Sequence, residues 1–335
     1  MQAIAGPFLL YLGDKTNPLD IKTSRGLALF RPGECVGELS LGGGLSLGLP
    51  QMDPTQAVAA GARTLVLGIA TSGGRLEETM IAPILAALDA GLDVASGLHQ
   101  HLADDPRIRE RAAATGGRLI DIRIAAKGLA VGNGTPRAGN RLLTVGTDCA
   151  VGKMFTSLHL TQALNAKGMS ARFRATGQTG VMIAGEGVVI DRVIADFISG
   201  AAEALSPARE DEVWDVIEGQ GSLFNPSFAG VSLGLLHGAQ PRALVLCHDP
   251  SRPHMRGLPH FPVPDLKACL EENLRCARLT SPDVAAVGVS INGSQMAPDD
   301  VANLCARIED ELGLPCVDPV ITGMEPIVER IAQLP

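Results

Sequence analysis

The chain has 335 residues and a formal net charge of −8, because 28 Lys and Arg residues stand against 36 Asp and Glu residues. Nucleic acids and anionic membranes select clustered positive charge, so this balance argues against both as partners. With 46% hydrophobic and 19% charged residues the chain can bury a large core, which excludes disorder over most of its length and indicates two α/β domains.

The first 130 residues alternate between strand-like and helix-like segments. The expected strands are 8–13, 64–70, 92–95 and 118–122, and the expected helices are 78–90 and 106–114. Strands that alternate with helices form parallel sheets, so this part predicts a small Rossmann-like α/β domain.

A segment rich in turn formers, 131–140 (VGNGTPRAGN), is the best linker and places the domain boundary near residue 138. The expected domains are therefore 1–138 and 139–335. Beyond the linker the expected strands are 141–145, 171–175, 214–217, 243–247, 284–291 and 315–317. The expected helices are 154–166, 193–204, 230–237, 266–278, 299–311 and 325–331. This regular alternation predicts a doubly wound α/β sheet.

The N-terminus lacks a basic segment before its apolar run at 8–12, and no stretch of 18 uncharged apolar residues occurs, which favours a cytoplasmic protein. Seven cysteines are scattered without a C-x-x-C pair. We therefore expect reduced thiols and no metal site. We also expect a homo-oligomer that acts on a small molecule.

The sharpest motif is GTDCAVGKM, in which an apolar strand passes through a loop between two glycines into a helix. It consists of Gly146, Thr147, Asp148, Cys149, Ala150, Val151, Gly152, Lys153 and Met154. Such a loop predicts phosphate binding, because backbone N–H groups, the N-terminus of the helix and the lysine all favour an anion. With one residue more than G-x-x-x-x-G-K, it is similar to the loop of dethiobiotin synthetase.

Met154 stands where ATPases and GTPases carry the Ser or Thr whose hydroxyl holds Mg²⁺. A thioether does not replace that hard oxygen ligand. The motif therefore favours a ligand whose phosphates are held and not cleaved, and coenzyme A is such a ligand. For Cys149 we favour a small loop residue over a nucleophile.

Polar turns follow several predicted strands. Glu218, Gln220 and Ser222 follow the strand 214–217. Gln178 and Thr179 follow the strand 171–175. Because strands of a parallel sheet end at one edge, we expect all these side chains near Lys153.

Two further turns carry ionisable groups. His248 and Arg252 follow the strand 243–247, and Arg75 follows the strand 64–70 of the first domain. Histidine accepts protons near neutral pH, and arginine binds carboxylates in a bidentate manner. The absence of G-x-G-x-x-G, H-E-x-x-H and G-x-S-x-G leaves no support for a dinucleotide-dependent dehydrogenase, a zinc hydrolase or a serine esterase.

Nearly end to end, the chain resembles the bacterial DgcN-type family of P-loop proteins, which is associated with D-glutamate N-acetyltransferase activity. The resemblance rests on GTDCAVGKM (146–154), ATGQTG (175–180), EGQGS (218–222) and LCH (246–248). It implies transfer of an acetyl group from acetyl-CoA to the amine of D-glutamate, without a metal, in a catabolic route that a dehydratase continues. Met154 agrees with that family.

The mechanism expected from this resemblance is direct transfer on the phosphate loop. Glu218 and His248 are both candidate general bases, and the two are not ranked. Backbone N–H groups of the turns 178–180 and 220–222 are candidate oxyanion donors. Arg75 and Arg252 are candidate clamps for the substrate carboxylates. Two alternatives stay open: an ATP-dependent kinase or ligase in which Glu218 and Asp148 hold Mg²⁺, and a non-catalytic protein that senses a nucleotide or CoA.

Overall fold

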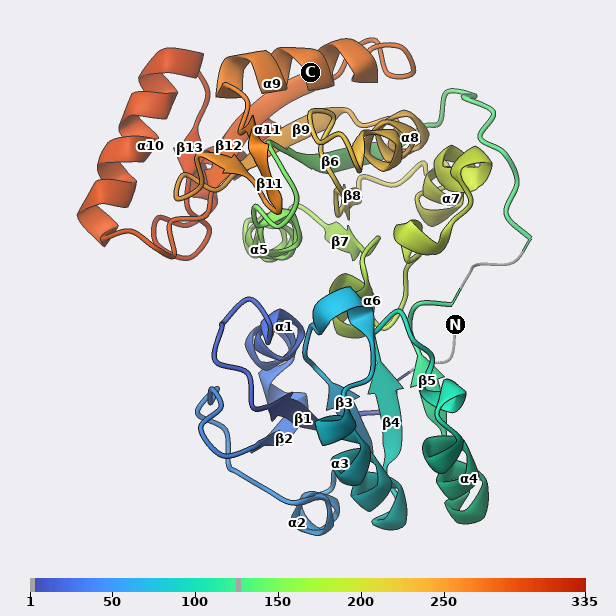
Figure 1. Ribbon diagram of the computed structural model, residues 1–335. Coiled ribbons are helices and arrows are strands. Elements are labelled where there is room, and N and C mark those ends of the chain that lie inside the picture. The colour runs from blue at the N-terminus through green and yellow to red at the C-terminus, as the bar shows by residue number, and fades with distance from the viewer. Residues whose placement is uncertain (1–3, 125–127) are drawn as a thin grey trace. The chain divides into compact units, whose positions relative to one another are not determined.

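The computed structural model describes residues 4–124 and 128–335. Its chain divides into two compact units. The first contains residues 1–125 and 181–189, and the second contains 126–180 and 190–335. Each unit has its own sheet and is described by itself (Figure 1).

The first unit is built on a parallel sheet in the order β2-β1-β3-β4-β5. Its strands are β1 (Phe8–Gly13), β2 (Cys35–Ser40), β3 (Thr64–Leu67), β4 (Asp93–Ser96) and β5 (Leu119–Asp121). Its helices include α1 (Lys22–Phe30), α2 (Pro54–Ala59), α3 (Glu78–Asp89) and α4 (Pro106–Thr115). This strand order places the switch point, where parallel α/β sheets bind ligands, between β1 and β3.

The second unit contains a six-stranded parallel sheet in the order β13-β12-β9-β6-β8-β7. The strands are β6 (Asn140–Gly146), β7 (Ala171–Arg174), β8 (Trp214–Ile217), β9 (Ala243–His248), β12 (Ala285–Ile291) and β13 (Cys316–Val317). A hairpin of β10 (His254–Met255) and β11 (Leu258–Pro262) follows β9. The switch point of this sheet lies between β6 and β9, which pair so that Gly146 is opposite Cys247.

Helices cover both faces of this second sheet (Figure 1). They are α5 (Lys153–Ala166), α7 (Ile198–Leu205), α8 (Ala229–Ala239), α9 (Leu266–Ala277), α10 (Pro298–Leu312) and α11 (Glu325–Ala332). Apolar side chains of α8, α9 and α10 pack on one face, and those of α5 and α11 pack on the other. All seven residues of the central strand β6 are buried, as expected for a strand covered on both faces.

The predicted fold class is confirmed, and each predicted strand and helix has a counterpart in the structure, although α7 begins five residues later than the predicted helix 193–204 and β3 ends three residues before the predicted strand 64–70. Six of the described α-helices and strands were not predicted: α1, β2, α2, the helix α6 (Gln178–Ala184) and both strands of the hairpin, β10 and β11. The division also differs from the predicted boundary near residue 138. It falls at residue 125, and 181–189 returns to the first unit, so that the division also passes through α6.

Candidate active site

The phosphate loop connects β6 to α5 at the switch point of the second sheet. Gly152, at φ +100°, is the residue before the first turn of α5. Ala150 has φ +54°, a conformation that costs a non-glycine residue about 1 kcal/mol or more. A Cβ on Gly146 would lie 3.1 Å from the Lys153 Nζ and 2.8 Å from a methyl of Val151. The loop therefore closes tightly around the lysine, and glycine at position 146 makes this closure possible.

The loop also presents donors. Within the part of the chain that the structure describes, the backbone N–H groups of residues 148–152 donate to no acceptor. They lead directly into the N-terminus of α5. Consecutive N–H groups at a helix N-terminus form a binding site for an anion.

Lys153 is buried, with 7% of its surface exposed, and its Nζ donates to the Asp148 carbonyl at 2.7 Å. Burial lowers the pKa of this ammonium, because removal from water disfavours its charged form. A phosphate bound in the loop would place a negative charge beside the Lys153 ammonium and so stabilise its charged form.

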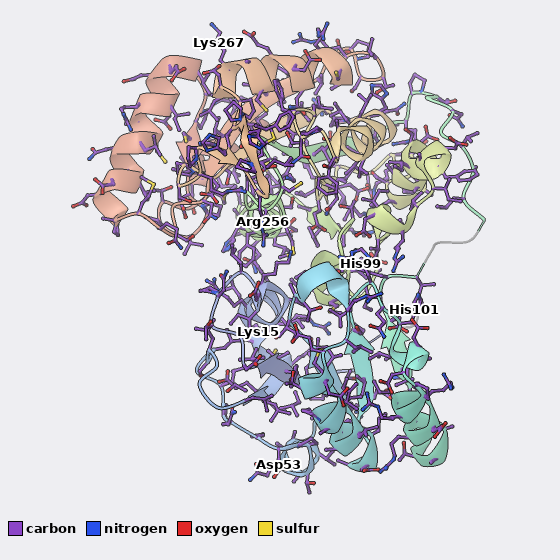
Figure 2. The ribbon with its side chains drawn as sticks, viewed as in Figure 1. Lys15, Asp53, His99, His101, Arg256 and Lys267 are labelled. Atoms are coloured by element: carbon purple, nitrogen blue, oxygen red, sulfur yellow. The ribbon has the colours of Figure 1, made fainter. Side chains whose placement is uncertain are left out.

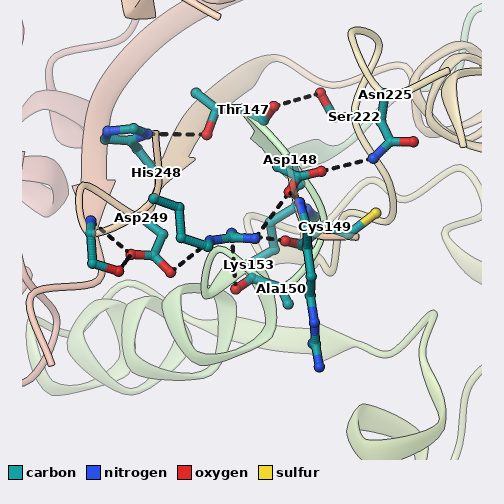
Figure 3. Close-up of polar contacts among 12 residues, drawn as sticks. Thr147, Asp148, Cys149, Ala150, Lys153, Ser222, Asn225, His248 and Asp249 are labelled. Atoms are coloured by element: carbon teal, nitrogen blue, oxygen red, sulfur yellow. Dashed lines mark hydrogen bonds and ion pairs between the residues drawn. The ribbon is translucent and has the colours of Figure 1, made fainter. Parts of the chain in front are cut away.

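Asp148 brings a carboxylate into this anion-binding loop, and three donors compensate it (Figure 3). One oxygen accepts from Asn225 Nδ2 at 2.8 Å. The other accepts from Arg252 Nη1 at 3.0 Å and from the Arg256 backbone N–H at 2.7 Å. Both oxygens are thus engaged, so the Mg²⁺ role considered for Asp148 in a kinase or ligase would require these bonds to break.

All three nitrogens of the Arg252 guanidinium donate hydrogen bonds. It donates to Asp148, to Asp249 Oδ2 at 3.0 Å and to the Cys149 carbonyl at 3.0 Å. In this structure the guanidinium connects the phosphate loop to the turn after β9. A role as substrate clamp, predicted from the sequence, would need it to leave these partners.

Glu218 follows β8 and accepts two backbone hydrogen bonds, from the N–H groups of Thr176 and Gly177, each at 3.0 Å. The Gln220 amide donates to its other oxygen at 3.2 Å. A Cβ on Gly177 or Gly180 would collide with this carboxylate, which explains both glycines of the TGQTG segment. Glu218 thereby fixes the first turn of α6 against the end of β8.

Thr147 joins the phosphate loop to two neighbouring turns (Figure 3). Its hydroxyl lies 3.1 Å from His248 Nδ1, and its carbonyl accepts from Ser222 Oγ at 3.2 Å. Burial lowers the pKa of His248, so the imidazole is neutral at pH 7 and can accept a proton.

The structure thus brings most of the predicted residues of the second unit together. Hydrogen bonds connect Thr147 to His248 and to Ser222, and Lys153 donates to the carbonyl of the next loop residue, Asp148. Gln178 and Thr179 begin α6, whose start is fixed by Glu218. Arg75 belongs to the first unit, in the loop after β3.

Three contributors were missed by the sequence analysis: Asn225, Asp249 and the backbone of Arg256. One signal pointed to them, namely an aspartate inside an anion-binding loop, because a carboxylate there requires nearby donors. The motif did not show where in the chain those donors lie.

Within residues 4–124 and 128–335, no helix has the length and apolarity needed to cross a bilayer. The same ranges contain no group of three or more His, Cys, Asp or Glu side chains that could hold a metal ion.

Fold and site together define an α/β protein with a phosphate-binding loop at the switch point of its second sheet. The model of a P-loop domain, "Domain of unknown function (DUF1611_C)", matches residues 130–328, and that of a Rossmann-like domain, DUF1611_N, matches 32–125. The chain therefore belongs to the DUF1611 family.

Similar proteins match nearly the whole chain. A curated protein of Pseudoalteromonas sp is 48% identical over 98% of this chain and 99% of its own, and one of Tritonibacter scottomollicae is 44% identical over the same shares. Both are named D-glutamate N-acetyltransferase. The crystal structure of a DUF1611 family protein from Anabaena variabilis, 30% identical, superposes with a TM-score of 0.86 over 98% of this chain and 100% of that one. These relatives confirm the family resemblance stated from the motifs.

Proposed function

We propose that the chain is a D-glutamate N-acetyltransferase that takes the acetyl group from acetyl-CoA. The two relatives of that name support the reaction. The observation in the site that carries it is the row of N–H donors at residues 148–152, combined with a lysine and without an oxygen ligand at Met154. This set of groups fits phosphates that are bound and not transferred.

Acetyl-CoA supplies a thioester whose carbonyl carbon an amine can attack. The loop 148–152, the N-terminus of α5 and the Lys153 ammonium would hold its phosphates. No residue of this set requires a metal, and the carboxylate of Asp148 already has three donors.

His248 is the stronger of the two candidate bases. Its imidazole is neutral at pH 7, because burial lowers its pKa, whereas the Glu218 oxygens accept backbone and amide hydrogens. When His248 Nδ1–H donates to the Thr147 hydroxyl, Nε2 keeps the lone pair that removes a proton from the substrate ammonium. The C–N bond then forms, the C–S bond breaks, and the second proton that the nitrogen loses on becoming an amide passes to the leaving thiolate.

The role of Glu218 in this site is to position the start of α6. Its carboxylate holds the start of α6, and the N–H groups of 178–180 stay candidate donors to the oxyanion, together with those of 220–222. Arg75 stays the candidate for a substrate carboxylate. A cytoplasmic location, a homo-oligomeric state and a place in D-amino acid catabolism also stay predictions.

A panel of two donors and two acceptors tests the function. Purified protein is incubated with acetyl-CoA or Mg²⁺-ATP and with D- or L-glutamate, while free thiol and phosphate are followed. Thiol release that requires acetyl-CoA and D-glutamate supports the proposal. Phosphate release that depends on glutamate contradicts it and favours the kinase or ligase alternative. Saturable binding of CoA without turnover of any pair favours a sensing protein.

A further inference from the structure

The first unit has an open polar pocket of about 480 Å³ that the phosphate loop does not explain. Its lining comes from two loops, 73–75 after β3 and 99–104 after β4. Figure 2 shows His99 and His101 at the end of this unit where β4 ends, with Asp53 at the opposite end. The pocket therefore lies at the carboxyl edge of a parallel sheet, beside its switch point, where such folds bind ligands.

Backbone hydrogen bonds and close packing hold the two loops together. The Gly74 carbonyl accepts from the backbone N–H groups of His99 and Gln100, at 2.9 and 3.0 Å. Gly73 and Gly74 both have φ +64°, and a Cβ on Gly74 would lie 3.0 Å or less from His99 atoms. Glycine is thus required here both for conformation and for the close approach of the two loops.

The lining carries a cation, a carboxylate and an amide. Arg75 is exposed, and among the described residues no hydrogen-bond or ion-pair partner is found for its guanidinium. The Gln100 Oε1 accepts from the Leu76 N–H at 3.0 Å, which leaves the amide NH₂ as a donor. Asp104, also exposed, adds a carboxylate, one oxygen of which accepts from the His101 N–H at 3.1 Å.

We propose that this pocket binds the amino-acid substrate, a dicarboxylic α-amino acid. Arg75 and Gln100 contact carboxylate groups, and Asp104 contacts the ammonium group. The identity of the amino acid rests on the proposed function, whereas the pairing of carboxylate with Arg75 rests on the pocket alone.

Calorimetry with the full-length protein tests the pocket without acetyl-CoA. The two probes are D-glutamate and glutarate, which has the same two carboxylates and no ammonium group. We expect Arg75→Ala to weaken both probes by about 10- to 100-fold, the scale for a lost hydrogen bond to a charged group. Gln100→Glu keeps the oxygen that accepts from Leu76 but removes the donor, and it should also weaken both.

Two variants sharpen the result. Asp104→Asn should weaken D-glutamate and leave glutarate unchanged, because only D-glutamate has an ammonium group. Arg63→Ala is the matched control, since Arg63 is also exposed but precedes β3 and so lies at the opposite edge of the sheet. All four variants should keep the affinity of the wild type for CoA, which a general loss of folding would not spare.

The outcomes separate the pocket from the function. If Arg75→Ala binds both probes like the wild type, or acetylates D-glutamate with an unchanged KM, the pocket assignment is wrong and the function stands. If the wild type acetylates no amino acid but binds glutarate in a manner that needs Arg75, the function is wrong and the pocket stands. A wild type that binds neither probe overturns the pocket.

Discussion

Asp148 places a carboxylate in the middle of a loop whose other groups favour an anion. Asp148 is fully buried, and its partners Asn225 and Arg252 stand 77 and 104 positions later in the chain. A motif shows the order of residues along a loop, and so GTDCAVGKM predicted the loop and its lysine. It did not predict the role of Arg252, because that role depends on which distant side chain the fold places beside the carboxylate.

Replacement of Lys153 by Met removes one positive charge from the anion site and so tests what that charge contributes to CoA binding. The variant keeps an apolar stem, so we expect the Kd for CoA to rise by about 10- to 100-fold, by calorimetry, with no dependence on added Mg²⁺. The Tm should not fall, since removal of a buried charge ends its desolvation cost. Lys267→Met, at an exposed position in the first turn of α9, is the control and should change neither quantity. An unchanged Kd in Lys153→Met would exclude the loop as the CoA site.

His248→Ala should lower kcat by about 10²- to 10⁴-fold and leave the KM for acetyl-CoA unchanged. Because only neutral imidazole accepts a proton, wild-type kcat/KM should fall as the pH drops through the pKa of His248. Burial lowers that pKa, so this acid limb lies below the ordinary value near 6.5. Kinetics between pH 5 and 8 measure it.

The hydroxyl of Thr147 provides a second check on this base. Thr147→Val removes the hydrogen bond to Nδ1 and should lower kcat, whereas Thr147→Ser should restore it. If kcat/KM of His248→Ala falls at low pH in the same way as that of the wild type, another group is the base.

At the scale of elements, periodicity predicted the long helices and the buried strands. It missed β2, an edge strand with the mixed sequence CVGELS, and α6, which begins in TGQTG. Turn-forming residues at the start of α6 are compatible with a helix because Glu218 binds the N–H groups directly before it. That long-range contact overrides local propensity.

Two glycines of the second unit should respond to alanine in opposite directions. A Cβ on Gly219 would overlap the Thr144 carbonyl oxygen and lie 3.2 Å from the Lys153 side chain, so Gly219→Ala should lower stability by about 1–3 kcal/mol. Gly230, in α8, has open space in place of its Cβ, and Gly230→Ala should raise stability by about 0.5–1 kcal/mol. Urea unfolding of both variants measures the difference, and equal effects would contradict the close packing of the turn after β8.

The hairpin β10–β11 brings a further positive charge, in addition to Lys153 and Arg252, to the phosphate loop. The Arg256 backbone is fixed to Asp148, its side chain is exposed, and its charge acts on the Cys149 thiol. We expect Arg256→Ala to raise the Kd for CoA several-fold while the Kd for pantetheine, which has no phosphate, stays the same. His260→Ala, at another exposed position of the hairpin, is the control. Equal losses for the two ligands would exclude a contact between Arg256 and phosphate.

At the scale of the whole molecule, both parallel sheets were predicted, but the path of the chain between the units was not. Residues 181–189 follow the P-loop domain's second strand in sequence and still belong to the first unit. Within them Val181, Met182 and Ile183 are buried, and the Met182 carbonyl accepts from Arg31 at 3.2 Å. Hydrophobic patterning shows that such residues are buried, but it does not show in which core.

A fragment cut at the predicted boundary tests this arrangement. Residues 1–138 contain all five strands of the first sheet but lack 181–189, and each buried side chain of that segment contributes about 1.5–3 kcal/mol. We expect this fragment to unfold at lower urea concentration, and less cooperatively, than the same fragment with 181–189 attached by a Gly/Ser linker. Circular dichroism follows both. Identical transitions would show that the segment contributes nothing to the first unit.

The return of 181–189 also sets an order of events on the ribosome. A domain formed from one continuous stretch can finish folding as soon as its last residue leaves the exit tunnel. Here the first unit must wait for more than sixty further residues, and at about 5–20 residues per second that is a delay of roughly 3 to 13 seconds. During this interval the first unit lacks the contacts that 181–189 makes within it, including the burial of Val181, Met182 and Ile183. Nascent chains of this protein are therefore candidates for chaperone binding before the second unit has been made.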